Sequence, residues 1–198
     1  MTADAPILRL ATTADAHAVA AIYAPYVRET PISFELQPPT AEAMAGRIER
    51  TLARTPWVVA VDDGVVRAYA YAGRVRDRGA YDWTAESTVY VDRSLHRSGL
   101  GRATMSAVLR VLRLQGFRLV IAGVTLPNAG SEGLHRALGF EPVGTFDGVG
   151  WKAGRWHGVS FFELEFFPCV DGPQPAPIRP LPELLGTPEL AAAIAGEG

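Results

Sequence analysis

The chain has 198 residues, enough for one well-filled hydrophobic core, and its 48% apolar and 20% charged residues are ordinary for a globular protein. The formal net charge of -2 gives no reason to expect a nucleic-acid partner, and the single cysteine, Cys169, excludes an intrachain disulfide or a cysteine-rich metal site. No apolar run approaches the roughly 20 residues that span a bilayer, and residues 1–10 lack the features of a secretion signal, so we expect a cytoplasmic protein with no membrane partner.

The first half of the chain predicts a strand, two helices and a hairpin of two further strands. In chain order these are a strand at 7–10, a helix from Thr13 to about Arg28, a helix from Thr40 to about Arg54, and strands at 57–61 and 65–71. Apolar residues recur at helical spacing in the first helix, for which Thr13 is a suitable N-cap. Asp62-Asp63-Gly64 is a typical hairpin turn between the two strands.

The second half alternates strands and helices more regularly. The expected elements are a strand at 84–91, a helix from Ser98-Gly99 to Gln115, a strand at 118–124, a helix from Asn128 to about Leu138, and strands at 143–149 and 159–166. The 118–124 strand is apolar on both faces, which is typical of a strand inside a sheet. Helices do not alternate with strands in the first half, so a doubly wound nucleotide fold is excluded and a mixed α/β (α+β) sheet is expected.

The composition changes after residue 167. Seven of the chain's 15 prolines lie in the last 31 residues, among small residues and few aromatic ones. Segments of this composition are extended more often than they are packed. We therefore expect one domain at 1–167 and an extended proline-rich C-terminal tail at 168–198, with a short helix at 188–194.

A glycine turn flanked by arginines precedes the third predicted helix. Gly99-Leu100-Gly101 alone fits a simple tight turn as well as a phosphate-binding loop. Arg97 and Arg102, however, lie near the positive end of a helix, where cations are unfavourable by ~0.3–1 kcal/mol unless an anion is bound. A dinucleotide fingerprint is excluded because Thr104 replaces its third glycine, and a Walker loop because the only lysine, Lys152, does not follow a glycine. The turn therefore indicates a different phosphate-containing ligand.

One carboxylate interrupts the 84–91 strand. Glu86 shares a face with Thr84, Thr88 and Tyr90, and this face is either exposed to solvent or turned towards a site. In the second case, partial burial would raise the pKa of Glu86 and suit it to act as a general base.

Two histidines have ordinary interpretations when they are considered alone. His135 lies on the face of its helix away from Leu134 and Leu138, where a solvated or capping histidine is expected. His157 lies between aromatic strand residues and is expected to be structural. Neither position by itself predicts catalysis.

The connector before the 84–91 strand contains Arg74, Arg76 and Arg78. These arginines form a solvated loop or hold an anionic substrate, because the guanidinium fork suits carboxylates and phosphinates. Tyr81 and Trp83 follow them, and either line a small pocket or fill the core.

Several segments together form a recognisable family pattern. They are Phe34, residues 69–73 (YAYAG), 80–91 (AYDWTAESTVYV), 97–101 (RSGLG), 126–128 (LPN), His135 with 137–140 (ALGF), and 154–157 (GRWH). The chain thereby resembles the GNAT superfamily of acetyl-CoA-dependent N-acetyltransferases, and within it the phosphinothricin and methionine-sulfoximine acetyltransferases. The resemblance spans roughly residues 7–167 and implies a GNAT fold, with a mixed central sheet splayed to hold acetyl-CoA and helices on both faces.

The resemblance implies that acetyl-CoA, the co-substrate, lies in a gap between the strand that ends at Val91 and the strand after Arg118. The strand would pair with the pantetheine arm, and the backbone of the glycine turn would hold the pyrophosphate. The residues implied to bind the coenzyme are Val89, Tyr90, Val91, Arg97, Ser98, Gly99, Leu100, Gly101, Arg102 and Asn128. GNAT turns usually begin with Gln or Arg at the position of His96. We expect coenzyme binding to survive this departure, because that position contributes mostly backbone.

The resemblance also implies the catalytic and acceptor-binding residues. Glu86 matches the general base that takes a proton from the substrate ammonium, and His135 matches a second catalytic residue. Phe34, Tyr71, Arg76, Arg78 and Tyr81 fall at acceptor-pocket positions. No metal is required, and Cys169 lies beyond the catalytic fold, so direct transfer in a ternary complex is expected.

The expected function is N-acetylation of a small amino-acid-like amine that contains a carboxylate and a second oxyanionic or sulfonyl-like group. A homodimer is expected from the resemblance alone. Two alternatives stay open: an acetyltransferase for another amino acid or amine, and a GNAT module that binds acyl-CoA without turnover. The basic connector at 74–78 disfavours a polyamine substrate, and the intact Glu86 disfavours a non-catalytic module.

Overall fold

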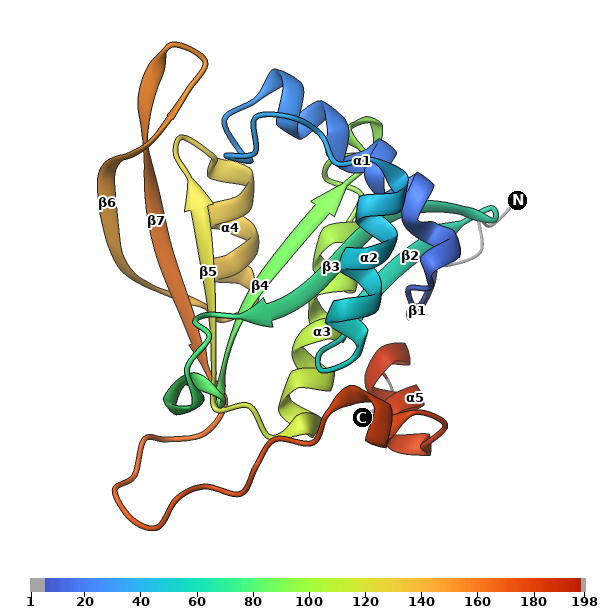
Figure 1. The fold of residues 1–198 in the computed structure, drawn as a ribbon, viewed down its shortest axis with the longest axis vertical. Helices are drawn as coiled ribbons and strands as arrows, with labels where there is room; N and C mark the ends of the chain where they lie inside the picture. The colour runs from blue at the N-terminus through green and yellow to red at the C-terminus, as the bar shows by residue number, and fades with distance from the viewer. Residues whose placement is uncertain (1–5, 197–198) are drawn as a thin grey trace.

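A seven-stranded mixed sheet forms the centre of the computed structural model, which describes residues 6–196 (Figure 1). The strands are β1 (Ile7–Leu10), β2 (Trp57–Asp62), β3 (Val65–Arg74), β4 (Thr84–Val91), β5 (Leu119–Thr125), β6 (Glu141–Lys152) and β7 (Arg155–Glu165). They lie in the order β1-β2-β3-β4-β5-β7-β6, and all neighbours are antiparallel except β4 and β5. The predicted mixed sheet is confirmed.

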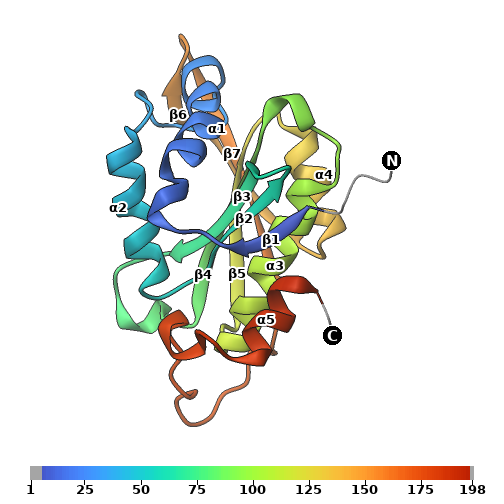
Figure 2. The same ribbon diagram turned by 90° about the vertical axis from the view of Figure 1, so that its right-hand side faces the viewer.

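Helices cover both faces of this sheet, as predicted (Figure 2). They are α1 (Ala16–Glu29), α2 (Ala41–Leu52), α3 (Leu100–Gln115), α4 (Ala129–Ala137) and α5 (Pro188–Ala195). α1 and α2 pack on one face, around a core that contains Trp57 and Tyr69. α3 packs on the other face, around a second core that contains Met105 and Phe117. None of the helices within residues 6–196 combines the length and the apolar character that crossing a membrane requires.

The first helix begins later than the sequence predicts. Residues Thr13–Asp15 form a 3-10 turn, so the N-cap is Thr12 and not the predicted Thr13. The backbone N–H of Thr12 donates to Asp15 Oδ2 (2.8 Å), and Arg9 binds the same carboxylate through two contacts of 2.7 Å. These interactions fix the chain before α1. The other predicted helices agree with the observed bounds to within two residues at each end.

β4 and β5 diverge halfway along their length, as Figure 1 shows. Their parallel pairing covers only three positions, from Thr84 opposite Leu119 to Glu86 opposite Ile121. β4 continues to pair with β3 as far as Val91, so the remaining backbone of β4 has no strand partner on the β5 side. The predicted splayed gap between these strands is confirmed.

The final hairpin is longer than predicted. β6 and β7 continue to a tight turn, in which Ala153 and Gly154 have positive φ angles of 49° and 80°. Gly148 and Gly150 interrupt the apolar alternation of β6, and for this reason the sequence pattern did not reveal the outer part of the hairpin.

The segment after residue 167 returns to the body of the protein. Residues 168–177 are exposed and contain no helix or strand. From Ile178 onwards the chain packs on α3, with Leu181, Leu184 and Leu190 buried beside Val111. The predicted short helix is confirmed as α5. The expectation of an extended tail is wrong for the part after Ile178, because its leucines form an apolar surface that the proline content concealed.

Candidate active site

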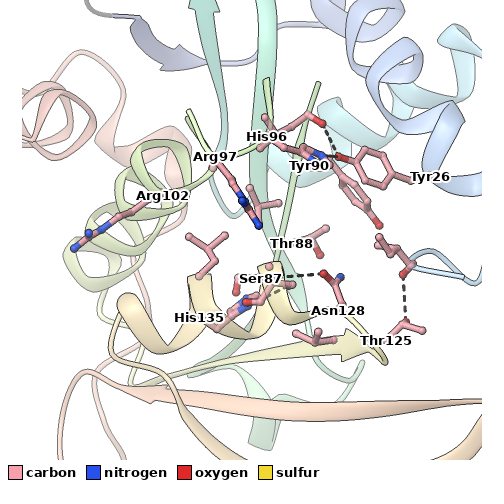
Figure 3. A pocket seen from close by; sticks show the side chains of 18 of the residues that line it. Tyr26, Ser87, Thr88, Tyr90, His96, Arg97, Arg102, Thr125, Asn128 and His135 are labelled. Atoms are coloured by element: carbon pink, nitrogen blue, oxygen red, sulfur yellow. Dashed lines mark hydrogen bonds between the residues drawn. The ribbon is translucent and has the colours of Figure 1, made fainter. Parts of the chain in front are cut away.

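A cleft of about 590 Å³ opens where β4 and β5 diverge (Figure 3). Its lining comes from the end of β4 (87–91), the turn before α3 (95–102), the end of β5 (123–125) and the start and inner side of α4 (128–135). All the residues implied to bind the coenzyme line this cleft except Leu100. The Leu100 side chain is buried against Ala60 and Ala68, so this residue can contribute only its backbone.

The turn before α3 brings the N-terminal end of that helix to the cleft. Arg97 and Gly99 have positive φ angles of 66° and 87°, which reverse the chain immediately before the helix begins. The first-turn amides of a helix have no acceptors within the helix, and the helix dipole favours an anion at this end. Gly101 allows α3 to approach β4 closely, because a Cβ at this position would lie 3.1 Å from Val91 Cγ2. This geometry suits a phosphate chain.

The two arginines of the turn point in different directions (Figure 3). The guanidinium group of Arg97 points into the cleft, whereas that of Arg102 points away from it. Both residues contribute to the lining. Arg97 is therefore placed to contact an anion inside the cleft, and Arg102 can reach only the outer part of a long ligand.

His96, the departure from the usual GNAT turn, binds a tyrosine of α1. Tyr26 Oη donates to the carbonyl of Val91 (2.6 Å) and lies 2.7 Å from Nε2 of His96 (Figure 3). A phenol has a single hydrogen, so Nε2 of His96 is the donor in the second contact. The contacts tie the start of the turn to the end of β4. The sequence did not predict this role of Tyr26, because the two residues lie 70 positions apart.

Glu86 lies beside the cleft, at the last position at which β4 pairs with β5. It shares its face of the strand with Tyr90, which packs against Tyr23 of α1 (centroid distance 4.8 Å). A Cβ on Gly123, which lines the cleft, would lie 3.9 Å from Glu86 Oε1. Burial raises the pKa of Glu86 above its usual value, and the positive charge of Arg76 partly opposes this shift. Of the two interpretations of this face, the structure favours a site over open solvent.

His135 is buried, so the expectation of a solvated or capping histidine is wrong. Its side chain is only 4% exposed, and the ring lies near Phe140 and Phe162 (centroid distances 5.1 and 5.9 Å). Nδ1 lies 2.8 Å from the carbonyl of Ser131 and therefore bears the hydrogen. Burial lowers the pKa of His135, although the Ser131 carbonyl offsets part of this effect, so the imidazole is neutral near pH 7. Nε2 is then an acceptor, and it has no partner among residues 6–196.

His157 is also buried, and its Nε2 lies 2.9 Å from the carbonyl of Lys152, which agrees with the expected structural role. Neither His135 nor His157 belongs to a metal-binding cluster. In the described part of the chain, no three His, Cys, Asp or Glu side chains gather in a way that would hold an ion.

The residues implied for the acceptor pocket lie outside the 590 Å³ cleft. Tyr71 pairs with Thr88 and so shares the face of Glu86, while Arg76 is close enough to Glu86 to affect its pKa. Phe34 covers Gly150, where an added Cβ would lie 2.3 Å from the phenyl ring. The remaining two, Arg78 and Tyr81, lie on the exposed connector between β3 and β4, and the structure does not bring them to the cleft.

The only lysine anchors the loop that contains Phe34. Lys152 Nζ donates to three backbone carbonyls, those of Val27 (2.7 Å), Ser33 (2.5 Å) and Glu35 (2.8 Å). The side chain is buried, and this burial lowers the pKa of Lys152. The sequence contained no signal for this contact, because its acceptors are backbone atoms more than 100 residues away.

Comparison with known proteins gives a consistent result. A family model described as an acetyltransferase (GNAT) domain matches residues 8–159. The phosphinothricin N-acetyltransferase of Streptomyces viridochromogenes is 41% identical over 177 residues, which are 89% of this chain and 95% of that protein. The L-methionine sulfoximine/L-methionine sulfone acetyltransferase of Salmonella typhimurium is 33% identical, over 80% of this chain and 93% of its own length.

A solved structure shares the fold. The crystal structure of a GNAT superfamily phosphinothricin acetyltransferase from Sinorhizobium meliloti, in complex with AcCoA, matches with a TM-score of 0.78 and 34% identity. The match covers 81% of this chain and 88% of the other. With the splayed sheet and the glycine turn in the same chain, these similarities show that it belongs to the GNAT acetyltransferase family, as an N-acetyltransferase that uses acetyl-CoA.

Proposed function

We propose that the acceptor is a small amino-acid analogue such as phosphinothricin, methionine sulfoximine or methionine sulfone, acetylated on its amino group by direct transfer. The names of the relatives support this class of acceptor. The observation on which it chiefly rests is the partly buried Glu86 beside the cleft, with Arg76 within electrostatic reach. A proton acceptor for an amine and a cation for a carboxylate thus lie together, as an α-amino acid requires.

The coenzyme is bound mainly by backbone groups in this proposal. The unpaired edge of β4 at Val89 and Val91 suits the amides of the pantetheine arm, and the N–H groups of 97–102, together with the Arg97 side chain, suit the pyrophosphate. Asn128 already accepts from the N–H of Ser131 to cap α4 (3.2 Å), so its amide nitrogen is the group left for the coenzyme. Bound acetyl-CoA supplies an acetyl group activated as a thioester.

Glu86 is the general base in this proposal. Burial raises its pKa, which makes it a stronger proton acceptor than an exposed glutamate. It takes the ammonium proton directly or through one water, which leaves an uncharged amine to attack the thioester carbonyl. The C–N bond forms, the C–S bond breaks, and coenzyme A leaves as a thiolate that takes up the proton lost by the new amide nitrogen. His135 is the second catalytic residue in this proposal, because it lines the cleft and the buried Nε2 of its ring is an acceptor without a partner among residues 6–196. No acyl-enzyme is needed, since Cys169 is exposed beyond β7.

The proposed assembly is a cytoplasmic homodimer. The β6–β7 hairpin projects from the molecule (Figure 1) and exposes large apolar side chains, including Phe146 (62%) and Trp156 (64%). Exposed apolar side chains on an edge strand favour association with a second surface of the same kind. Light scattering should give twice the chain mass for the wild type and a smaller mass for Phe146→Asp. A wild-type protein that stays monomeric at micromolar concentration contradicts the dimer.

A parallel assay tests the acceptor class. Thiol release from acetyl-CoA is followed with phosphinothricin, methionine sulfone and spermidine. We expect turnover with the first two and none with spermidine. Turnover with a different amine alone would favour the alternative of another acceptor. Binding of acetyl-CoA without turnover of any of the three would favour a non-catalytic module.

A further inference from the structure

A second pocket, of about 460 Å³, lies between α2 and the paired ends of β2 and β3. Trp57, Tyr71 and Gly73 form part of its lining on the sheet side. Four arginines also line it: Arg47 and Arg50 from α2, Arg54 from the turn after α2, and Arg74 from the end of β3. We term it the arginine pocket. It shares no lining residue with the coenzyme cleft.

Within residues 6–196, the four guanidinium groups of the arginine pocket have two carboxylate partners between them. Arg47 forms a two-pronged contact with Glu35, at 2.6 and 2.9 Å. Arg54 and Arg74 both bind the same oxygen of Asp82, at 3.1 and 2.8 Å. One carboxylate oxygen shared by two cations leaves positive charge uncompensated.

The side chain of Arg50 forms neither a hydrogen bond nor an ion pair with any residue within 6–196. Arg50 lies four residues before Arg54, which is in the turn just after α2, and it adds a further positive charge to the lining of the pocket. Burial, and then the positive charge of the neighbouring Arg74, lower the pKa of Arg54, while Asp82 opposes this shift. Arg54 and Arg74 are two like charges that share one carboxylate, so they repel each other. An anion bound between them would remove this repulsion.

The surface over Gly73 connects the arginine pocket with Glu86. Gly73 lies directly opposite Glu86 in the β3–β4 ladder, so the two residues belong to the same face of the sheet. A Cβ on Gly73 would have no atom within 4 Å, so the space above this residue is open. Burial raises the pKa of Tyr71, and both Arg47 and Glu86 act on it as well, so its hydroxyl lies within electrostatic reach of the pocket and the proposed base.

We propose that the arginine pocket is an acceptor subsite that binds an oxyanion on the side chain of the amino-acid substrate, while the amino group lies at Glu86. The inference rests on the proposed function and names the group by which the acceptor is selected. Arg76, beside Glu86, is left for the α-carboxylate. Adjacent strands are ~4.8 Å apart, so a pocket over β2 and β3 lies one to two strand spacings from Glu86, within reach of an extended acidic side chain.

Two acceptors that differ in side-chain charge test the subsite. Phosphinothricin has a charged phosphinate, whereas methionine sulfone has a neutral sulfone on a similar amino-acid frame. In Arg50→Gln, the KM for phosphinothricin should rise about tenfold, the loss expected for one charge-assisted hydrogen bond. The KM values for methionine sulfone and acetyl-CoA should stay within about twofold of wild type. Arg50→Lys should restore part of the loss.

Arg28→Gln is the matched control, because it removes one exposed arginine from α1 outside the pockets described here. It should change none of the KM values. An equal rise for both acceptors in Arg50→Gln would identify Arg50 as a structural residue and overturn the subsite, and no change for either would overturn it too.

Calorimetric binding of phosphinothricin separates this subsite from the proposed function. Wild-type binding that Arg50→Gln weakens about tenfold supports the subsite. If the wild type and Arg50→Gln bind phosphinothricin equally, the subsite is overturned, whereas the proposed acceptor class stands. Absence of both binding and turnover with the wild type overturns the proposed acceptor class together with the subsite.

Discussion

The coenzyme cleft and the acceptor side of the sheet are built from different kinds of contact. The cleft comes mainly from the part of the chain between β4 and α4, with Tyr26 and Ile32 added from α1 and the loop after it, and presents mainly backbone groups: an unpaired strand edge and the first turn of α3. The acceptor side comes from α2, the loop after α1, the β3–β4 connector and the β6–β7 hairpin, and it presents side chains. Recognition of the acetyl donor therefore depends on the fold itself, whereas recognition of the acceptor depends on individual residues.

Glu86→Gln should have the largest effect, because it removes the proposed base without changing the shape of the site. General-base catalysis contributes typically 10²–10⁴-fold, so we expect kcat to fall by about that factor at neutral pH. The affinity for acetyl-CoA should stay within about threefold, since the proposed contacts with the coenzyme are mainly to the backbone of the cleft and Glu86 does not line it. Steady-state kinetics and calorimetry measure the two quantities. A mutant with wild-type kcat would remove Glu86 from this role.

Lys152→Met should affect the acceptor side and leave the coenzyme cleft intact. The substitution leaves three buried carbonyls of the Phe34 loop without their donor, at a cost of about 2–3 kcal/mol, or a fall in Tm of about 5–10 °C. The released loop should raise the acceptor KM about tenfold, with the Kd for acetyl-CoA unchanged.

Arg155→Met is the control for Lys152→Met, because Arg155 is exposed in the same hairpin. The kinetics are measured well below the Tm of both variants. An equal loss of acetyl-CoA affinity in Lys152→Met would show that the two sides of the site are not separable in this way.

Gly101→Val should have the opposite effect to Lys152→Met: it should disturb the coenzyme cleft and leave the acceptor side intact. The added side chain would meet Val91 and push the start of α3 away from β4, which displaces the amides proposed to hold the pyrophosphate. We expect the Kd for acetyl-CoA to rise about tenfold, while the acceptor KM at saturating acetyl-CoA changes little. Gly133→Ala, in α4, is the control, since a Cβ there meets no atom within 4 Å.

The sequence predicted the coenzyme side better than the acceptor side, for a physical reason. The order of the elements, the 84–91 strand and the Gly99 turn depend on local periodicity and on glycine φ angles, which a short segment determines by itself. The anchoring role of Lys152 and the pairing of His96 with Tyr26 depend on contacts between distant segments. No local pattern contains that information.

His135 shows the same limit within a single helix. The spacing of apolar residues in α4 placed His135 away from the Leu134 stripe and therefore predicted solvent. β7 brings Phe162 against that side of the helix, and the histidine is buried. The arginine pocket is a further case, because Arg47, Arg50 and Arg54, from α2 and the turn after it, form a single surface only with Arg74 of β3. The residues proposed to select the acceptor are thus the ones least visible in the sequence.

Arg76→Gln should have the smallest effect and tests how the acceptor side tunes the base. Glu86 acts in its ionised form, so kcat/KM falls as the pH falls through its pKa. Burial raises this pKa, and the charge of Arg76 lowers it again. Removal of that charge should therefore raise the pKa further and move the acid limb of the kcat/KM profile to higher pH, by a fraction of a unit. Arg78→Gln removes a charge from the same connector and should leave the limb in place. A shift to lower pH in Arg76→Gln, or equal shifts in both variants, would contradict a specific Arg76–Glu86 interaction.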